Sequence, residues 1–359
     1  MTSHFLRDIL RQPVELQRAI EYLAGDGRQT LEEAAAAVRG ARHVYVTGIG
    51  ASWHAALNAG ALFHLGGRPV YLWDASELLH FSVIPPDAVI VVLSRSGRSV
   101  EIVRLLSKAR VNRATVIGVT NAADEPLARE SQIAIVVPAG RDHGISVNTY
   151  STLALASGAL ATAAVSSFDN TLAESLSRGV AETGQTVGTW REQIAGSAWF
   201  KPALPHYFLA RGSSLGSCYE ARLLWEEGVK LPATSMGTGT FRHGPQEIVT
   251  DDSRFGMWID GAHMREEDFA VARDLRRLGS SVMLIGQGLP DDAGDLVFQL
   301  PEMPAQWQFL IDIIPVQLAA EYLSRLSGVD CDAFRLCSYV VEGEHGLLPE
   351  REASPNCGV

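Results

Sequence analysis

The chain has 359 residues, of which 47% are apolar and 20% charged, so two domains with buried cores are expected. Its formal net charge of -11 argues against the basic face that nucleic-acid binding requires. A small anion is still a permitted ligand, because a few local donors suffice to bind one.

The N-terminal region predicts two helices rather than a targeting segment. Apolar residues recur at helical spacing from Phe5 to about Val38, with a break near Gly25, and no signal-peptide core is present. The longest apolar stretch, 153–165, is rich in Ala and Gly and too short to span a bilayer. We therefore expect a buried helix there, no membrane contact and a cytoplasmic location.

The next part of the chain predicts a parallel α/β domain. A β-branched run at 43–46 leads through a Gly-rich turn into a helix that begins at about Ser52. Four further apolar runs follow in "PVYLWDASELL", "AVIVVLS", "ATVIGVTN" and "IAIVVPAG", with helical patterns in several of the gaps. After N-terminal helices over 1–39, we place the first domain at 40–166.

The pattern then restarts after a helical linker at 167–200. Apolar runs in "HYFLARG", "FGMWIDG", "SVMLIGQG" and "DLVFQL" predict a second domain at 201–345, followed by a tail at 346–359. "HVYVTGIGASWHAA" and "HYFLARGSSLGSCYEA" are weak copies of one strand–turn–helix unit. The expected fold class is α/β, with two similar domains, each a parallel sheet flanked by helices in a flavodoxin-like three-layer sandwich.

A hydroxyl-rich turn after one of the apolar runs is a candidate anion site. In "VVLSRSGRSVEIVRLL", the hydroxyls of Ser94, Ser96 and Ser99 precede a helical pattern. Backbone N–H groups at a helix start have no internal partner and lie at the positive end of the helix dipole, which favours a phosphate. The alternative is that Ser94 or Ser96 only caps the helix.

Ser52 strengthens the phosphate interpretation. It lies in "GIGAS", an equivalent strand-to-helix turn, and two such turns meet at the carboxyl edge of one sheet, where ligands bind in open α/β folds. "GIGAS" lacks the third glycine and the acidic partner of a dinucleotide site. We expect no cofactor.

A second group of residues suits proton transfer. Glu220 and Glu227 are seven residues apart, two helical turns, so they share a helix face, and His243 follows in a loop before Gly244. Carboxylate and imidazole together would serve proton abstraction and ring opening of a sugar. The alternative is that the glutamates solvate a helix surface and that His243 caps a turn.

Metal dependence is not expected. The histidines and carboxylates form no zinc or hard-metal pattern. The four cysteines have neither metal spacing nor a disulfide framework and are interpreted as free thiols. They are Cys218, Cys331, Cys337 and Cys357.

These motifs together resemble the double sugar-isomerase (SIS) domain family. "LSRSGRSVE" is similar to the family's phosphate loop, "DASEL" to its Ala-Ser-Glu segment, "TNAADEPLARES" to its Asn…Arg-Glu-Ser run and "FRHGP" to its His-Gly-Pro turn. The resemblance covers nearly the whole chain. Within the family, the chain resembles the isomerase domain of glucosamine-6-phosphate synthase, the tagatose-6-phosphate isomerase/amino-sugar deaminase branch and the fructoselysine-6-phosphate deglycase branch.

The resemblance assigns roles to several residues. It implies that Glu227 moves a proton between C1 and C2, that Glu220 is a second active-site glutamate, and that His243 assists ring opening from the neighbouring subunit of a homodimer. It also implies that a group of residues from two turns binds the substrate phosphate. This group is Ser52, Ser94, Arg95, Ser96 and Ser99, with Gly50 as a weaker contact. Arg95 stands where the synthase has Gln, and its partner is left open between the phosphate and a carboxylate of the substrate.

The chain also departs from the family pattern. The synthase's C-terminal lysine has no counterpart in "FRLCSYVVE", where Ser338 or Tyr339 falls near its place. The serine of the family's Val-Ala-Ser segment corresponds to Val147, so Ser146, Asn148 or Thr149 is expected to substitute for it. A glutaminase domain and its N-terminal cysteine are not seen in this sequence, which disfavours the synthase reaction.

The sequence therefore predicts an aldose–ketose isomerase or deaminase acting on a hexose or aminohexose 6-phosphate. Deglycation of a glycated amino acid 6-phosphate is the second hypothesis. A non-catalytic phosphosugar sensor is the alternative from another class. The Glu227/His243 pair argues against a sensor.

Overall fold

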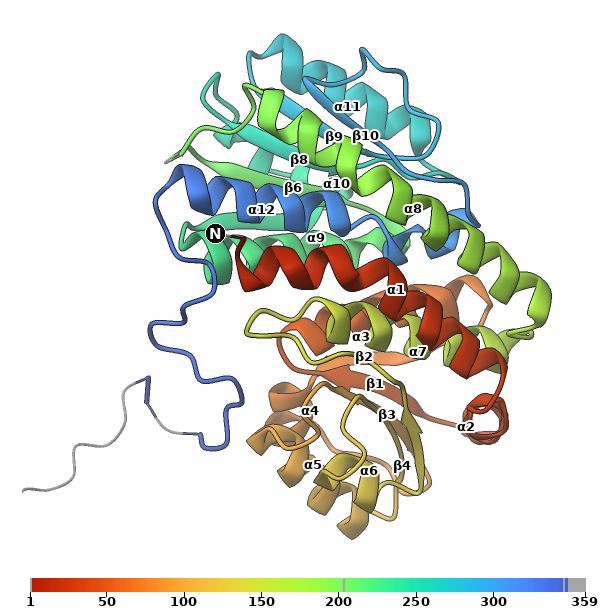
Figure 1. The fold of residues 1–359 in the computed structure, drawn as a ribbon. Coiled ribbons are helices and arrows are strands. Elements are labelled where there is room, and N and C mark those ends of the chain that lie inside the picture. Colours follow the sequence, from red (N-terminus) through yellow and green to blue (C-terminus); the bar gives the residue numbers. More distant parts are fainter. Residues whose placement is uncertain (1, 203, 345, 348–359) are drawn as a thin grey trace, which may run out of the picture.

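Two parallel five-stranded sheets form the framework of the computed structural model, which describes residues 2–202, 204–344 and 346–347 (Figure 1). The first sheet has the order β2-β1-β3-β4-β5 and the second the order β10-β9-β8-β6-β7. The first comprises β1 (Val44–Gly48), β2 (Tyr71–Asp74), β3 (Val89–Ser94), β4 (Thr115–Thr120) and β5 (Ile133–Val136). The second comprises β6 (His206–Ala210), β7 (Ala233–Gly237), β8 (Arg254–Trp258), β9 (Ser281–Gly286) and β10 (Leu296–Gln299).

The two sheets repeat one topology. If β6 is taken as the counterpart of β1, both sheets have the strand order 2-1-3-4-5, which is the flavodoxin-like arrangement. All their pairings are parallel, for example Val46 with Val91 in the first sheet and Phe208 with Gly256 in the second. The predicted fold class, two similar parallel α/β domains, is confirmed.

Helices cover both faces of each sheet. The first half contains α1 (His4–Ala24), α2 (Arg28–Gly40), α3 (Ala51–Leu65), α4 (Ala75–Phe81), α5 (Val100–Val111), α6 (Pro126–Glu130) and α7 (Asn148–Val165). The second contains α8 (Asn170–Gly196), α9 (Leu215–Leu224), α10 (Thr238–Phe241), α11 (Arg265–Arg277) and α12 (Ile314–Leu326). Short 3-10 segments are η1 (Gly212–Ser214), η3 (Pro245–Ile248) and η4 (Ala305–Leu310), and η2 (Trp225–Val229) is a π-helix turn.

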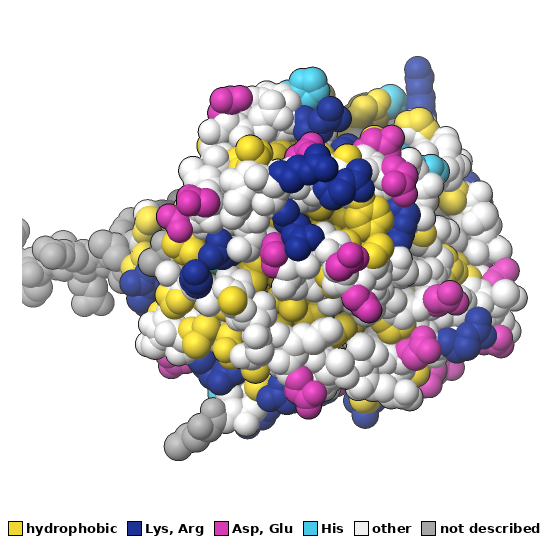
Figure 2. Space-filling model, turned by 90° about the horizontal axis from the view of Figure 1, so that it is seen from above, with side chains coloured by type: hydrophobic (Ala, Val, Ile, Leu, Met, Phe, Trp, Pro, Cys, Tyr) yellow, Lys and Arg dark blue, Asp and Glu magenta, His cyan; other side chains and the backbone are white. Residues whose placement is uncertain are grey.

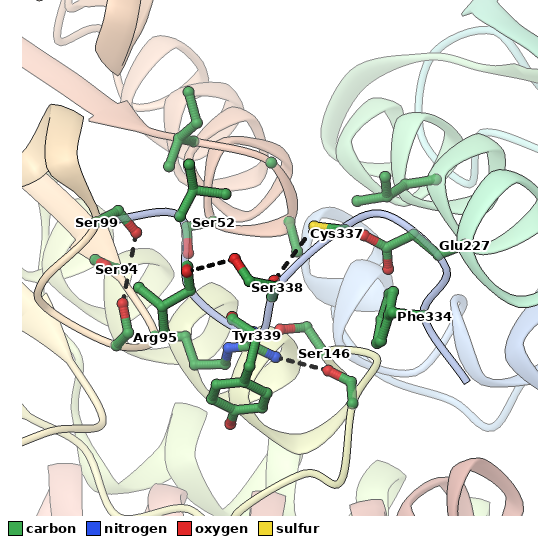
Figure 3. A pocket seen from close by; sticks show the side chains of 18 of the residues that line it. Ser52, Ser94, Arg95, Ser99, Ser146, Glu227, Phe334, Cys337, Ser338 and Tyr339 are labelled. Carbon is green, nitrogen blue, oxygen red and sulfur yellow. Dashed lines mark hydrogen bonds between the residues drawn. The ribbon is translucent and has the colours of Figure 1, made fainter. Parts of the chain in front are cut away.

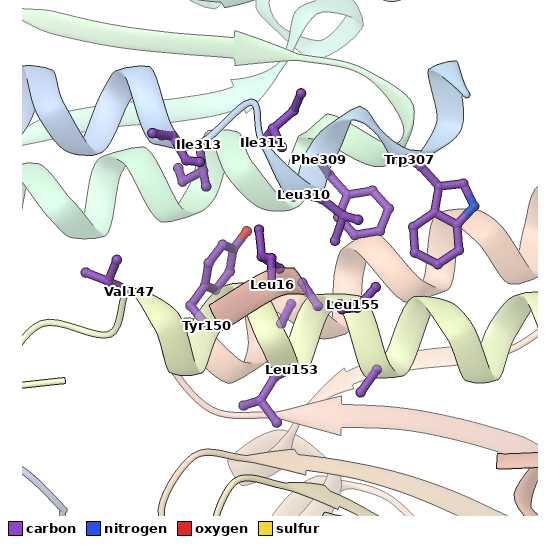
Figure 4. Packing of buried hydrophobic residues seen from close by; sticks show 14 of the residues in the cluster. Leu16, Val147, Tyr150, Leu153, Leu155, Trp307, Phe309, Leu310, Ile311 and Ile313 are labelled. Atoms are coloured by element: carbon purple, nitrogen blue, oxygen red, sulfur yellow. The ribbon is translucent and has the colours of Figure 1, made fainter. Parts of the chain in front are cut away.

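The largest core lies between the two sheets. Helices α1, α3 and α7 meet α8, α9 and α12 there, and their buried side chains form one continuous cluster (Figures 1 and 4). Tyr150 and Leu155 of α7 face Phe309 and Leu310 from the segment before α12. Smaller clusters lie on the outer faces, under α4 and α5 in the first half and under α11 in the second.

Several sequence predictions can be compared with these elements. The helical linker expected at 167–200 contains α8, and the apolar stretch 153–165 is the buried end of α7. Pro315 lies in the first turn of α12, where a missing N–H breaks no helical hydrogen bond. Strand β7 was not predicted, because Ala-Thr-Ser-Met-Gly lacks an apolar alternation and β7 is an edge strand.

The surface mixes both signs of charge. Figure 2 shows basic and acidic side chains interspersed on one face, with several Lys and Arg side chains gathered near its centre around an apolar area. Within the part of the chain that the structure describes, no helix is long and apolar enough to cross a membrane.

Candidate active site

A cavity of about 200 Å³ lies at the carboxyl edge of the first sheet, where the chain leaves β1 and β3 in opposite directions. This is the point at which open α/β sheets bind ligands. Gly50 begins the turn after β1 with a φ of +56°, a conformation that residues with a Cβ seldom adopt. The first-domain lining includes Gly50, Ser52, Ser94, Arg95, Ser96, Ser99 and Ser146.

The loop after β3 presents its hydroxyls to this cavity. The Ser94 hydroxyl accepts a hydrogen bond from the Gly97 N–H at 3.0 Å, so Ser94 closes the loop rather than capping the helix. Ser99 occupies the N-cap position of α5, but its side chain makes no capping bond. The Ser96 and Ser99 hydroxyls are 3.5 Å apart, close enough for both to contact one anion oxygen. The geometry thus favours the anion interpretation of this turn.

Glu227 lies on the opposite side of the cavity from these serines (Figure 3). It belongs to the π-helix turn η2, which continues α9; such turns often occur at functional sites. The widened turn was not predicted from the seven-residue spacing of Glu220 and Glu227. Burial, followed by the charge of Glu220, raises the pKa of Glu227 to about 7. The neighbouring Glu226 is instead exposed and lies 4.0 Å from Arg222.

Glu220 is buried behind the cavity rather than in its lining. Its Oε2 atom lies 2.7 Å from Nδ1 of His54, a residue of α3 in the first half of the chain. The side chains of both residues are almost inaccessible, at 1% and 7% exposure. Sequence reasoning missed His54, although it stands two residues after Ser52 in "GASWH".

The C-terminal segment, defined here as residues 334–344, supplies one wall of the cavity. Phe334, Cys337, Ser338, Tyr339 and Val341 all contribute to the lining. The carbonyl of Val341 accepts a hydrogen bond from the Val100 N–H at 3.0 Å, at the start of α5. Outside the cavity, Glu342 and Glu344 pair with basic residues of the first half, namely Arg98, Arg104 and His80. The segment is therefore held against the serine-rich loop.

Arg95 connects three parts of the site. Its guanidinium donates to the carbonyl of Gly144 at 3.0 Å and to that of Tyr339 at 2.8 Å, and it lies over the Tyr339 ring at 4.1 Å (Figure 3). Its charge also lowers the pKa of Glu227. In this structure Arg95 thus binds the C-terminal segment. The sequence had left the partner of Arg95 open between the substrate phosphate and a carboxylate of the substrate, and the segment is a third possibility.

The three candidates for the family's serine lie in different surroundings. Ser146 lines the cavity, and its hydroxyl is 3.2 Å from that of Thr149. The side chains of Asn148 and Thr149 both donate to the buried carboxylate of Asp142, at 2.7 and 2.6 Å. Asn148 and Thr149 are not part of the lining of this cavity. They are engaged in fixing the start of α7.

His243 lies in an exposed turn between α10 and η3, as the loop prediction required. It is not among the residues that line the cavity of its own chain. The placement agrees with a role in the site of a second subunit, which we keep as a prediction.

The corresponding edge of the second sheet is built differently. After β8, the carboxylate of Asp260 accepts hydrogen bonds from the N–H groups of Ala262, His263 and Met264 at 3.3, 2.7 and 2.8 Å. A carboxylate thus occupies the anion position before α11, where the first domain offers free hydroxyls. The first sheet therefore has a serine-lined loop that could bind an anion, whereas in the second sheet the Asp260 carboxylate of the chain itself fills the equivalent position.

Among the described residues, His, Cys, Asp and Glu side chains form no group of three or more with the geometry to hold a metal ion. The cysteines that the structure describes, Cys218, Cys331 and Cys337, are free thiols, and Cys357 lies outside the described residues. The predicted tail at 346–359 lies almost entirely outside them as well.

Repeated parallel sheets with a hydroxyl-lined loop at the switch point define a double α/β protein with a candidate anion site. Residues 37–165, which contain the whole first sheet, match the SIS domain. The resemblance inferred from the sequence motifs is thereby confirmed.

Comparison with known proteins shows which proteins the whole chain is similar to. It is 24% identical over 343 residues to a glutamine–fructose-6-phosphate aminotransferase (isomerizing) from Pyrobaculum aerophilum, covering 92% of the chain and 56% of that relative. The chain thus spans about half the length of the curated relatives it matches. In fold it is similar to glucosamine-6-phosphate deaminase from Thermotoga maritima, with a TM-score of 0.80, 20% identity and coverage of 94% of this chain and 99% of that one.

A second solved structure shows the same architecture. Tagatose-6-phosphate ketose/aldose isomerase from Escherichia coli has a TM-score of 0.78 and 21% identity, covering 93% of this chain and 96% of that one. At these identities the structural likeness establishes the fold.

Proposed function

We propose that the protein is an aldose–ketose isomerase or deaminase that acts on a hexose or aminohexose 6-phosphate. The observation that carries this proposal is the placement of Glu227, a half-buried carboxyl with a pKa raised to about 7, across one cavity from the hydroxyls of the serine-rich loop. The names of the three relatives, an aminotransferase, a deaminase and an isomerase, all concern hexose 6-phosphates and support the same substrate class.

The loop after β3 would hold the phosphate. The hydroxyls of Ser96 and Ser99 converge at the start of α5, where the helix dipole favours a negative charge, and Ser52 adds a third hydroxyl from the turn after β1. With the phosphate at this end, the sugar chain extends across the cavity towards Glu227. This orientation brings C1 and C2, rather than C6, to the carboxylate.

Glu227 would act as the base. A general base works best when its pKa lies near the operating pH, and burial brings Glu227 to that range. After ring opening assisted by His243 of a neighbouring subunit, Glu227 removes the proton from C2 of the aldose and returns it to C1, through an enediol. The C1 oxygen gains a proton and the C2 hydroxyl loses one, so that the carbonyl moves from C1 to C2. No redox partner is required, because the proton moves within the substrate.

The same steps release ammonia from an amino sugar. With an amine at C2, proton transfer from C2 to C1 gives an enolamine and then a ketimine. Water adds to the ketimine carbon and ammonia leaves, so that the ketose phosphate forms. Glu220, buried next to this carboxylate, affects the step through its charge.

The test uses NMR in heavy water to measure proton exchange at C2 of glucosamine 6-phosphate and at C1 of fructose 6-phosphate. We expect exchange with the natural chain and its loss in Glu227→Gln, with ligand-induced thermal stabilisation retained. Glu226→Gln is the matched control, because Glu226 is an adjacent but exposed carboxylate. Stabilisation by these sugars without exchange would support a phosphosugar sensor instead, and an undiminished rate in Glu227→Gln would remove Glu227 from the role.

A further inference from the structure

A buried hydrogen bond joins the two halves of the chain directly behind the candidate base. His54 of α3 and Glu220 of α9 are 2.7 Å apart through Nδ1 and Oε2. An imidazole at this distance from a carboxylate donates to it, either as a neutral ring or as a cation. Neither residue lines the cavity, so this bond does not serve to form the cavity wall.

The close approach of α3 and α9 makes this bond possible. Gly216 precedes Glu220 by one helical turn, and a Cβ at Gly216 would lie 1.9 Å from Oδ1 of Asn58 and 2.4 Å from the carbonyl oxygen of His54. Only a residue without a side chain fits at this contact. The glycine therefore brings the next turn of α9 within hydrogen-bonding reach of His54.

Glu220 in turn acts on Glu227. The charge of Glu220 is the largest influence on Glu227 after burial itself, and it raises the pKa of Glu227. The other charged or titratable groups that face Glu227 come from its own turn, from the loop after β3 and from the C-terminal segment. They are Glu226 and Lys230, Arg95, and Cys337. Glu220 itself is faced by His54 from α3 and by Tyr150 from α7.

We propose that His54 is a positioning residue, which fixes Glu220 as a carboxylate beside the base Glu227. A buried carboxyl without a donor would take up a proton rather than remain charged. By donating to Glu220 across the two halves, His54 keeps the negative charge in place, and this charge holds the base in its protonated form up to neutral pH. The inference rests on the proposed role of Glu227.

Removal of either partner should make Glu227 a weaker base. In His54→Leu the Glu220 carboxylate loses the donor that holds it in place, and in Glu220→Gln it is replaced by a neutral amide of the same shape. Without the adjacent charge, Glu227 ionises at lower pH. The acidic limb of the pH–rate profile should therefore move down from about 7 by roughly one pH unit in both variants.

The experiment measures C2 proton exchange from pH 5 to 9 in the natural chain, His54→Leu, His54→Asn, Glu220→Gln and the His54→Leu/Glu220→Gln double variant. Asn retains a donor near the position of Nδ1, so His54→Asn should return the midpoint towards that of the natural chain. The double variant should show no further shift beyond either single one, because both changes remove the same charge. A purely structural role would lower thermal stability in His54→Leu but leave the midpoint unchanged, which would overturn the proposal.

A second readout separates this inference from the proposed reaction. The Glu227 carboxyl can be titrated by ¹³C NMR of glutamate-labelled protein, with Glu227→Gln identifying its signal. A lower titration midpoint in both His54→Leu and Glu220→Gln supports the positioning role even if no sugar phosphate is turned over, an outcome that would count only against the reaction. Conversely, turnover with an unmoved carboxyl titration would reject the positioning role alone. If His54→Leu fails to fold, His54→Phe, which keeps a ring at this position but removes the donor, decides the question.

Discussion

The guanidinium of Arg95 lies 4.1 Å from the centre of the Tyr339 ring and donates to the Tyr339 carbonyl at 2.8 Å. These two contacts connect the candidate phosphate loop to a residue 244 positions later in the chain. The C-terminal segment therefore forms part of the site, and its position depends on a residue of the anion loop.

Replacing Tyr339 by Ala should weaken substrate binding. The substitution removes the cation–π contact but retains the backbone carbonyl that Arg95 contacts, so the segment is held less firmly over the cavity. Loss of such a contact corresponds to about threefold to thirtyfold in affinity. The measurement is calorimetric titration with glucosamine 6-phosphate.

Tyr339→Phe is the control for this prediction, because Phe keeps the aromatic face while removing the hydroxyl. Its affinity should stay close to that of the natural chain. Tighter binding in Tyr339→Ala would show that the segment competes with the ligand instead of supporting it.

Asp312 should make the protein less stable at alkaline pH. Its carboxyl is fully buried between the sheets, and burial raises its pKa to about 7, an effect that the nearby Ser217 and Ser214 only partly offset. The folded state therefore retains a proton that the unfolded state loses above the ordinary pKa of 3.8. This contribution to stability is complete below pH 3.8 and is lost as the pH rises through about 7.

Asp312→Asn removes this titration. The unfolding temperature of the variant should therefore rise relative to that of the natural chain between pH 5 and pH 8.5, by an amount equivalent to roughly 3 kcal/mol at most. Thermal unfolding at the two pH values measures the difference. The exposed Asp291 gives a control, because Asp291→Asn should leave the pH dependence unchanged. An identical pH response in Asp312→Asn would show that Asp312 is ionised in the folded state throughout.

Local sequence patterns predicted the architecture well. Alternation of apolar runs with helical patterns is sufficient for a parallel sheet, and repetition of "GIGASW" and "RGSSLG" indicated two copies. The serines at the strand ends were predictable for the same reason, since topology alone brings such turns to one edge. Glu227 and its loop partners required the family resemblance, because a spacing of seven residues is equally consistent with a solvated helix face.

The parts of the site that could not be predicted depend on long-range contacts. His54 follows Ser52 by two residues, but only the close approach at Gly216 shows that it meets Glu220. The roles of Phe334 and Tyr339 depend on where the chain runs after α12, and no local pattern specifies that path. Asp260 likewise resembles an ordinary turn residue until its three backbone partners are seen.

Asp260→Ala should destabilise the second domain without affecting the site in the first. The carboxylate satisfies three N–H groups ahead of α11, and loss of a side chain at such a position costs about 0.5–2 kcal/mol. Urea unfolding should show a lower midpoint, while the affinity for glucosamine 6-phosphate stays the same. Asp260→Asn, which retains one acceptor oxygen, should lose less; equal stability of all three proteins would show that these bonds contribute nothing.

The shared site predicted for a homodimer can be tested by complementation between subunits. Glu227→Gln and His243→Gln should each be inactive as homodimers. In a heterodimer of the two, one site combines both substitutions, whereas the other combines the intact Glu227 of one chain with the intact His243 of its partner. Isolated through two different affinity tags, the heterodimer should therefore recover about half of the natural activity. The exposed position of His243, away from the cavity of its own chain, is the structural reason for this expectation. If His243 acted within its own subunit, each site of the heterodimer would carry one substitution, and the heterodimer would be as inactive as its parents.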